Sequence, residues 1–215
     1  MNWLAHLLLA DEDVEHRVGN VIADWVKGAA RAQFSAGIQR GFASHRQIDL
    51  YTDAHPVVAR SRARIEAPFK RYAAVLVDVF YDHFLAVDWL RYCAVPFERW
   101  TRDVYRQFAA HWQHLPEPVQ AGLRRMVAED WLGTYATPEG IALTLARMSR
   151  RLSRPNLLGA AASELRAHYA GLRSDFHLFF PQLPGARARW RHSVINPNRA
   201  ARLTASVRLA TSSLA

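Results

Sequence analysis

Helical periodicity is the feature that most constrains the fold of this chain. Apolar residues recur at spacings of three and four along most of the sequence, which is typical of amphipathic helices. Alternating runs bounded by Asn-Gly or Asp-Gly turns, which would predict hairpins, are absent. We therefore predict an all-α fold. The predicted helices lie within residues 2–10, 18–28, 36–54, 57–69, 72–93, 97–114, 116–132, 138–152 and 155–180.

Prolines mark several of the predicted helix boundaries. Pro56, Pro96 and Pro155 stand where helices are expected to begin. Thr137 precedes Pro138, which is the usual order of an N-cap followed by proline in the first helical turn.

Charge and cysteine content narrow the class of protein. The 28 Lys and Arg residues outnumber 19 Asp and Glu residues, which gives a formal charge of +9 and favours an acidic or polyanionic partner. A basic tail on an ordinary domain would explain the same excess. Cys93 is the only cysteine, which excludes an intramolecular disulfide and indicates, weakly, a cytoplasmic protein. No uncharged run approaches the roughly 18 residues of a membrane span, and no cleavable leader is recognisable.

The composition changes after Gly185. Residues 187–215 are rich in arginine and contain no acidic residue. We predict one helical domain over residues 1–185 and a basic C-terminal extension over residues 186–215. This extension is either a loose tail or carries one more amphipathic helix at residues 198–210.

Polar side chains interrupt the most apolar of the predicted helices. In VLVDVFYDHFLAVDW, Asp78, Asp82 and His83 stand among core-forming residues. Asp78 and Asp82 are about 40° apart on a helical wheel, so their carboxylates share a face and repel unless a cation or a proton lies between them. A divalent ion such as Mg²⁺, Mn²⁺ or Fe²⁺ would satisfy this set. The alternative is that both carboxylates hold arginines of neighbouring helices.

A second polar stripe lies in SHRQIDLYTD. His45, Asp49 and Asp53 are spaced at i, i+4 and i+8, so one helix face presents three potential metal ligands. A solvated polar face is the alternative, although Lys and Glu would be more typical there.

Two further motifs place a single polar residue in an apolar context. Asp24 stands in GNVIADWVKG and His6 in NWLAHLLLA. A lone buried histidine is more often a hydrogen-bonded core residue than a ligand. Because four predicted helices each carry such a residue, we expect them to converge on a polar metal pocket inside a helical bundle. A metal bound there would lower the pKa of a coordinated water and provide hydroxide.

With these motifs in place, the sequence resembles the acyl carrier protein phosphodiesterase family. The resemblance rests on NWLAHLLLA, GNVIADWVKG, HRQIDLYTD and DVFYDHFL in that order, and more loosely on RMSRRLSRP and FHLFFPQL. It covers roughly residues 1–183 and leaves out the arginine-rich end.

The resemblance implies a metal-dependent, all-helical enzyme similar to HD-domain phosphohydrolases, with Mn²⁺ as the expected ion and Mg²⁺ or Fe²⁺ as alternatives. Such an enzyme removes 4′-phosphopantetheine from holo-acyl carrier protein and leaves the apo-protein. The His-Asp doublet of HD enzymes is reversed here as Asp82-His83. The metal ligands implied by the matching motifs are Asp24, His45, Asp78, Asp82, His83 and His6. The catalytic or phosphate-contacting residues implied are Asp49, Asp53, Arg46 and Lys27.

The resemblance also implies a partner for the positive charge. Acyl carrier proteins resemble one another in being small and acidic, so a basic surface would steer their approach. The candidate patch follows Pro56, and a solvated helix face is its alternative. Its members are Arg60, Arg62, Arg64, Lys70 and Arg71.

Two other functions remain open on the sequence. The pocket could serve a nucleotide or another small phosphodiester. The chain could instead be a non-enzymatic helical module that binds nucleic acid through its basic tail. Nucleic-acid binders usually interleave basic residues with exposed aromatics, and in the tail only Trp190 fits that pattern.

Overall fold

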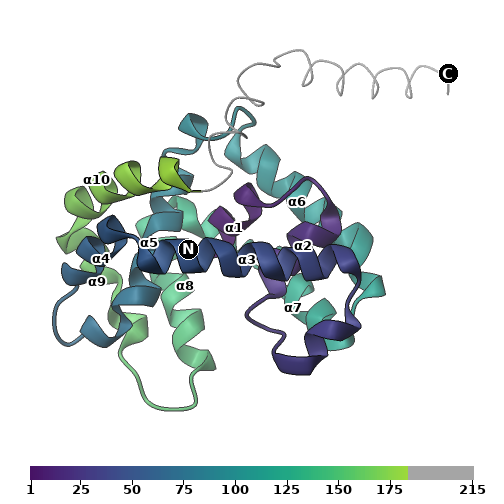
Figure 1. Ribbon diagram of the computed structural model, residues 1–215. Helices are drawn as coiled ribbons and strands as arrows, with labels where there is room; N and C mark the ends of the chain where they lie inside the picture. Colours follow the sequence, from purple (N-terminus) through teal and green to yellow (C-terminus); the bar gives the residue numbers. More distant parts are fainter. Residues whose placement is uncertain (184–215) are drawn as a thin grey trace.

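A computed structural model describes residues 1–183 of the chain (Figure 1). Within that range the backbone forms α-helices and short 3-10 helices and no strand, which confirms the all-α class. The likeness to HD-domain bundles and the central metal pocket stay predictions. The α-helices are α1 (Trp3–Leu9), α2 (Val14–Ile22), α3 (Ala36–Ala54), α4 (Pro56–Ala63), α5 (Ala73–Val87), α6 (Phe97–His111), α7 (Glu117–Ala128), α8 (Pro138–Arg151), α9 (Ala162–Ala167) and α10 (Tyr169–Phe179). The 3-10 helices are η1 (Gly28–Gln33), η2 (Lys70–Tyr72), η3 (Trp89–Arg91), η4 (Trp112–His114), η5 (Gly133–Ala136), η6 (Leu158–Ala160) and η7 (Phe180–Gln182).

Most helix boundaries follow local signals in the sequence. The helix α3 occupies the predicted residues 36–54, and Pro56 lies in the first turn of α4. At the start of α8, the hydroxyl of Thr137 accepts a hydrogen bond from the backbone N–H of Gly140, which confirms the predicted N-cap.

The predicted helix over residues 155–180 is wrong in its extent. Residues 155–157 are not helical, so Pro155 opens no helix. Farther along, α9 and α10 are separate because His168 has φ −116° and ψ 16°, outside the helical range. The spacing of apolar residues does not reveal this break, because both helices present apolar residues to the same core.

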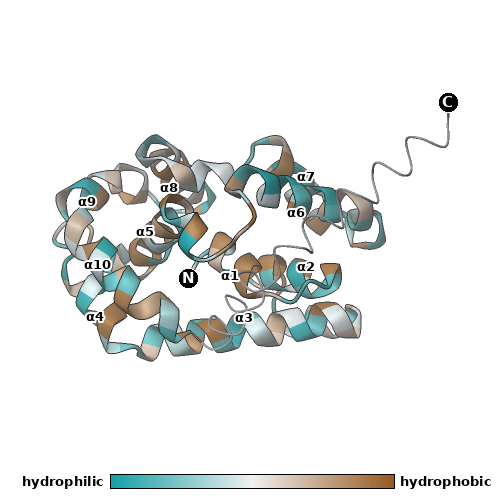
Figure 2. Cartoon of the chain, turned by 90° about the horizontal axis from the view of Figure 1, so that it is seen from above, coloured by the Kyte–Doolittle hydropathy of each residue, from teal (hydrophilic) through white to brown (hydrophobic). Residues whose placement is uncertain are grey.

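The longest helix, α3, crosses the molecule (Figures 1 and 2). Its C-terminal end meets α4, near α9 and α10, and its N-terminal half packs along α2, near α6 and α7. The helices α1 and α5 lie between these two groups. Side chains in the middle of the inner face of α3, such as Asp49, can therefore approach α1.

The centre of the core is α5. Phe80, Tyr81, Phe84 and Leu85 are fully buried, because this helix is apolar around most of its circumference. It packs against α1, α4, α8 and α10. Each buried aromatic or aliphatic side chain of this kind contributes roughly 1.5–3 kcal/mol, so this central packing holds α1 against the other helices.

Two glycines let the backbones of α2 and α3 touch. A Cβ at Gly41 would stand 2.4 Å from the carbonyl oxygen of His16, and a Cβ at Gly19 would stand 2.2 Å from that of Ile38. No larger residue fits at either position without separating the helices. The close approach fixes α3 against α2 and sets the position of the side chains one turn farther along α3.

The predicted boundary at residue 185 lies outside the described residues, which end at 183, and stays a prediction. The basic extension over residues 186–215, its predicted helix at 198–210 and Trp190 all lie outside them. No helix within residues 1–183 is long and apolar enough to cross a membrane.

Candidate metal centre

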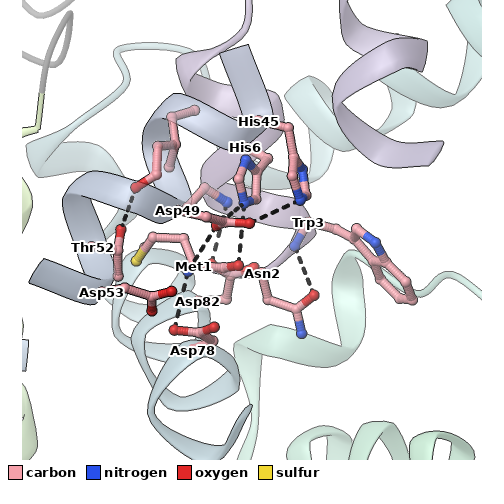
Figure 3. A network of polar contacts seen from close by, with 12 residues as sticks. Met1, Asn2, Trp3, His6, His45, Asp49, Thr52, Asp53, Asp78 and Asp82 are labelled. Atoms are coloured by element: carbon pink, nitrogen blue, oxygen red, sulfur yellow. Dashed lines mark hydrogen bonds and ion pairs between the residues drawn. The ribbon is translucent and has the colours of Figure 1, made fainter. Parts of the chain in front are cut away.

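Two histidines and one aspartate meet where α1 faces α3 (Figure 3). His6 comes from α1, and His45 and Asp49 come from adjacent turns of α3. Each offers a ligand atom, and these atoms all lie within 4.8 Å of one another. In the part of the chain that the structure describes, no other His, Cys, Asp and Glu side chains form such a group.

The carboxylate of Asp49 bridges the two imidazoles. Its Oδ1 lies 3.1 Å from Nε2 of His6, and its Oδ2 lies 3.0 Å from Nε2 of His45. The two rings are stacked with centroids 3.9 Å apart. Figure 3 shows the carboxylate between the two Nε2 atoms. Two imidazoles and one carboxylate are ligands that suit a divalent transition-metal ion, so these three residues fit such an ion.

The orientation of His45 is fixed from behind. Its Nδ1–H donates a hydrogen bond to the carbonyl oxygen of Asn20, at 2.8 Å. Holding Nδ1 in this way directs Nε2 toward Asp49 and toward Asp24, whose Oδ1 lies 3.6 Å from it. Backbone carbonyls commonly orient metal-binding histidines in this manner. The contact between α2 and α3 places the carbonyl of Asn20 within reach.

His6 is completely buried, and only one of its two ring nitrogens has a hydrogen-bond partner. Its Nε2 lies 3.2 Å from the carbonyl oxygen of Met1, in addition to its contact with Asp49. Its Nδ1 is buried and has no hydrogen-bond partner in the described part of the chain. Unpaired polar atoms at this depth are costly, so their presence here fits a site built for chemistry and not for stability alone.

The charges of the cluster are strongly coupled. Burial lowers the pKa of His6 to about 4, so this imidazole is neutral. Burial also acts to lower the pKa of His45, but the carboxylates of Asp24 and Asp49 outweigh it and raise that pKa to about 9. Hydrogen bonding to His45 holds the pKa of Asp24 below its ordinary value. The pKa of Asp49 is also lowered, because hydrogen bonds from His45 and His6 outweigh burial. At neutral pH His45 therefore carries the cation of the cluster.

Asp78 and Asp82, both on α5, lie near the N-terminal end of α1 but make different contacts. The carboxylate of Asp82 accepts hydrogen bonds from the backbone N–H groups of Leu4, at 2.7 Å, and Ala5, at 3.3 Å, so it caps the N-terminus of α1. Asp78 lies 3.1 Å from the amine of Met1, which in turn lies 3.6 Å from Asp49. Figure 3 shows this amine between the two carboxylates. Asp78 is thus linked to the cluster by a cation, and within residues 1–183 neither aspartate forms an ion pair with an arginine.

The remaining predicted site residues lie outside the cluster. His83 points the other way: its Nδ1 donates to the carbonyl oxygen of Tyr135, at 2.8 Å, and its Nε2 lies 3.3 Å from the hydroxyl of Tyr169. Asp53 is exposed and pairs with Arg62. Arg46 and Lys27 are also exposed. No hydrogen bond or ion pair joins these residues to the cluster within residues 1–183.

Sequence reasoning missed the residues that hold the cluster together. Asn20 stands within GNVIADWVKG, yet it acts through its backbone carbonyl, which leaves no trace in residue type. Gly19 and Gly41 carried the only available signal, because a glycine on the apolar face of a helix often marks a close helix contact. The N-terminus of α1 gave no sign that its amides would meet Asp82.

Comparison with known proteins gives a consistent result. The family model described as acyl carrier protein phosphodiesterase matches residues 1–183. A curated relative from Photorhabdus laumondii, named acyl carrier protein phosphodiesterase, is 33% identical over 187 residues, covering 85% of this chain and 93% of its own length. The proteins of the same name from Yersinia pestis and Escherichia coli O157:H7 are 33% and 30% identical, covering 85% and 88% of this chain and 95% and 98% of their own lengths. No solved structure matches the chain.

Proposed function

Because the chain belongs to the acyl carrier protein phosphodiesterase family, we propose that it hydrolyses the phosphodiester between 4′-phosphopantetheine and a serine of holo-acyl carrier protein. The products are apo-acyl carrier protein and 4′-phosphopantetheine. The observation that carries the proposal is the cluster of His6, His45 and Asp49, whose ligand atoms lie close enough together to hold one divalent ion.

The cluster is the proposed site of a divalent cation. His6, His45 and Asp49 would hold it, with Asp24 as a fourth ligand, since its carboxylate already contacts Nε2 of His45. Mn²⁺ is the proposed ion, with Mg²⁺ and Fe²⁺ as alternatives, because imidazole and carboxylate together suit these metals. When bound, such an ion supplies Lewis acidity at a phosphoryl oxygen and lowers the pKa of a coordinated water.

The protein groups around the cluster have separate proposed roles. Asn20 keeps Nε2 of His45 directed at the ligand position through the carbonyl hydrogen bond. The side chain of Asp24 is 70% exposed, so this fourth ligand would lie on the solvent side of the ion. Arg46 is an exposed cation next to His45 on α3, and Lys27 is an exposed cation in the segment after α2 that also carries Asp24. Both would offset phosphate charge at the mouth of the site.

Asp78 and Asp82 are proposed to act from behind the cluster. Asp82 holds α1 in place, and so fixes His6, through its two backbone hydrogen bonds. Asp78 adds negative charge next to Asp49 and pairs with the amine of Met1. His83 and Asp53 have no proposed contact with the metal, since their hydrogen bonds and ion pairs are formed elsewhere.

The protein substrate and the compartment belong to the same proposal. Holo-acyl carrier protein is the proposed partner, approached through a basic surface, and the cytoplasm is the proposed location. The patch expected after Pro56 is only partly available for docking, because Arg60 and Arg64 bind the buried Asp175 and Arg62 pairs with Asp53.

Mass spectrometry of the carrier protein tests the proposal. Holo-acyl carrier protein is incubated with the enzyme and Mn²⁺, with the enzyme after chelation, and with the His45→Gln variant. We expect loss of the phosphopantetheine mass in the first reaction only. The variant His111→Gln serves as the matched control, because His111 is a partly exposed histidine at the end of α6, and it is expected to retain turnover. An unchanged carrier protein in the first reaction, with metal bound, would mean that the site serves another phosphodiester.

A further inference from the structure

A hollow beside α1 is lined by hydrogen-bond donors and apolar groups. The hollow is shallow, because its enclosed volume is about 10 Å³ and the rest is open to solvent. No Asp or Glu lines it, and the hydroxyl of Thr144 already lies 3.0 Å from that of Thr134. The lining residues are Trp3, Trp131, Thr144, Arg147, Met148 and Arg151. A ligand that fills this hollow must therefore supply the acceptors.

The carboxylate of Glu129, next to this hollow, already has three partners. Glu129 accepts from Nε of Arg125 at 2.7 Å, from Nε1 of Trp131 at 3.0 Å, and pairs with Nε of Arg147 at 3.0 Å. Three guanidinium groups, those of Arg125, Arg147 and Arg151, thus share one negative charge. Two positive charges are left without a counter-charge at this surface.

The unbalanced positive charge lies mainly on Arg151. Its guanidinium carbon lies 4.7 Å from the ring centroid of Trp131 and 5.8 Å from that of Trp3. It makes no ion pair with a carboxylate in the part of the chain that the structure describes. Burial lowers its pKa, and the positive charges of Arg125 and Arg147 lower it further. A guanidinium held on an aromatic surface, close to like charges and without a carboxylate, is a binding group for an anion.

The two indoles form a rigid floor for that anion. Trp3 and Trp131 stack with centroids 5.1 Å apart and an interplanar angle of 17°. The Nε1–H of Trp3 is buried and has no acceptor within residues 1–183. The floor therefore gives the guanidinium of Arg151 a flat aromatic surface to lie on.

The hollow adjoins the metal centre. Trp3 lies one turn before His6 on α1, and the edge of Trp25 meets Trp3 at 6.2 Å between centroids. Trp25 directly follows Asp24, which contacts His45. In Figure 3 the indole of Trp3 extends away from the cluster of His6, His45 and Asp49. An anion over the two indoles would thus be bound beside the reacting phosphate but not at it.

We propose that Arg151 and Arg147, above the Trp3–Trp131 floor, bind a carboxylate side chain on the surface of the carrier protein near its modified serine. This inference rests on the proposed function. The substrate has one phosphate, which the metal centre takes, and the rest of the pantetheine arm is uncharged. The second anion must then come from the protein part of the substrate.

Inhibition by the two separated products tests this assignment. Apo-carrier protein retains the carboxylate and lacks the phosphate, whereas free 4′-phosphopantetheine retains the phosphate and lacks the protein. The enzyme, Arg151→Gln and the control Arg150→Gln, an exposed neighbour on α8, are compared with holo-carrier protein as substrate. We expect Arg151→Gln to raise both KM and the inhibition constant of apo-carrier protein roughly tenfold or more, which is the loss of one charge-assisted hydrogen bond. The inhibition constant of phosphopantetheine should not change, and Arg150→Gln should resemble the unchanged enzyme.

The outcomes separate the two proposals. An unchanged KM in Arg151→Gln, or a weaker inhibition by phosphopantetheine instead of by apo-carrier protein, overturns the carboxylate site while the wild-type turnover stands. Wild-type enzyme that leaves holo-carrier protein intact overturns the proposed function and this inference with it. Circular dichroism checks the fold of Arg151→Gln. If the variant is unfolded, the unchanged enzyme is assayed with carrier proteins in which each surface carboxylate near the serine is replaced by its amide: a raised KM for at least one of them supports the site, and an unchanged KM for all of them contradicts it.

Discussion

The imidazoles of His6 and His45 stack with centroids 3.9 Å apart, and the carboxylate of Asp49 contacts Nε2 of both. Two cationic rings at this distance would repel strongly, so only one of the two imidazoles carries a positive charge. Burial lowers the pKa of His6 to about 4, so His6 is the neutral ring. The neighbouring carboxylates raise the pKa of His45 to about 9, so His45 is the cationic ring. The cluster thus keeps a proton at the position where a metal would bind.

Metal binding should release that proton. Nε2 of His45 must be deprotonated to act as a ligand, so the apparent affinity for Mn²⁺ should rise roughly tenfold per pH unit below about pH 9. Calorimetric titration at neutral pH in buffers of different ionisation enthalpy should give close to one proton released per ion. Affinity that does not vary between pH 6.5 and 9 would contradict the ligand role of His45. The variant His45→Gln should bind weakly and release no proton.

The stability of the metal-free protein should fall as the pH rises through the same window. The pKa of His45 is raised from 6.5 in the unfolded chain to about 9 in the folded one, so its stabilising effect is complete below pH 6.5 and is lost by about pH 9. The loss is at most roughly 3 kcal/mol. Urea unfolding of the chelated protein at both ends of the window measures it. The amine of Met1, whose pKa is also raised, acts in the same direction, so the difference between wild type and His45→Gln isolates the histidine. Parallel pH profiles for the two proteins would refute the prediction.

Replacing Gly41 should damage both stability and metal binding. In Gly41→Ala the new Cβ would stand 2.4 Å from the carbonyl oxygen of His16, so α3 must move away from α2 at a cost of roughly 1–3 kcal/mol. That movement lengthens the hydrogen bond between His45 and the Asn20 carbonyl. Gly159→Ala is the matched control, since its Cβ would have no neighbour closer than 3.5 Å. Urea unfolding and Mn²⁺ titration of both variants check the prediction, which equal behaviour of the two would exclude.

The stripe on α3 could be predicted from the sequence because spacing of four residues fixes a common helix face. His45 and Asp49 are joined in the structure for that reason alone. The contribution of His6 could only be suspected, because an imidazole in an apolar run has no periodic partner. Its contact with Asp49 joins residues 43 positions apart, and this depends on how α1 crosses α3.

The roles of the residues on α5 could not be predicted in the same way. Asp82 caps α1 by accepting from Leu4, 78 positions earlier in the chain, through backbone N–H groups that any sequence possesses. His83 follows Asp82 directly, and one residue turns the side chain by about 100° around a helix. The two neighbours therefore face different surroundings, and His83 contacts Tyr135 and Tyr169. The pattern of residue types indicated a polar site, and only the helix packing decided which members meet.

Asp175 should be essential for stability. Its carboxylate is 1% exposed and accepts hydrogen bonds from Arg60, Ser61 and Arg64, which tie α10 to α4. In Asp175→Asn the buried side chain loses the charge that both partly exposed arginines bind, and one of its new N–H groups faces donors, which should cost roughly 1–3 kcal/mol. The exposed pair between Asp103 and Arg106 supplies the control: Asp103→Asn should cost less than about 1 kcal/mol. Unfolding free energies from urea titration decide the matter, and similar losses in the two variants would count against the network.

Metal content should separate His45 from His83. The variant His45→Gln removes a nitrogen that faces Asp24 and Asp49, so it should lose most of the bound Mn²⁺ after gel filtration. The variant His83→Gln removes the hydrogen bond to the Tyr135 carbonyl from a residue that is only 1% exposed. It should lower the unfolding free energy by roughly 1–3 kcal/mol while the metal stoichiometry stays that of the unchanged protein. Elemental analysis of both variants, with circular dichroism to establish that each is folded, gives the answer. A folded His83→Gln protein without metal would place His83 among the ligands and require α5 to turn on metal binding.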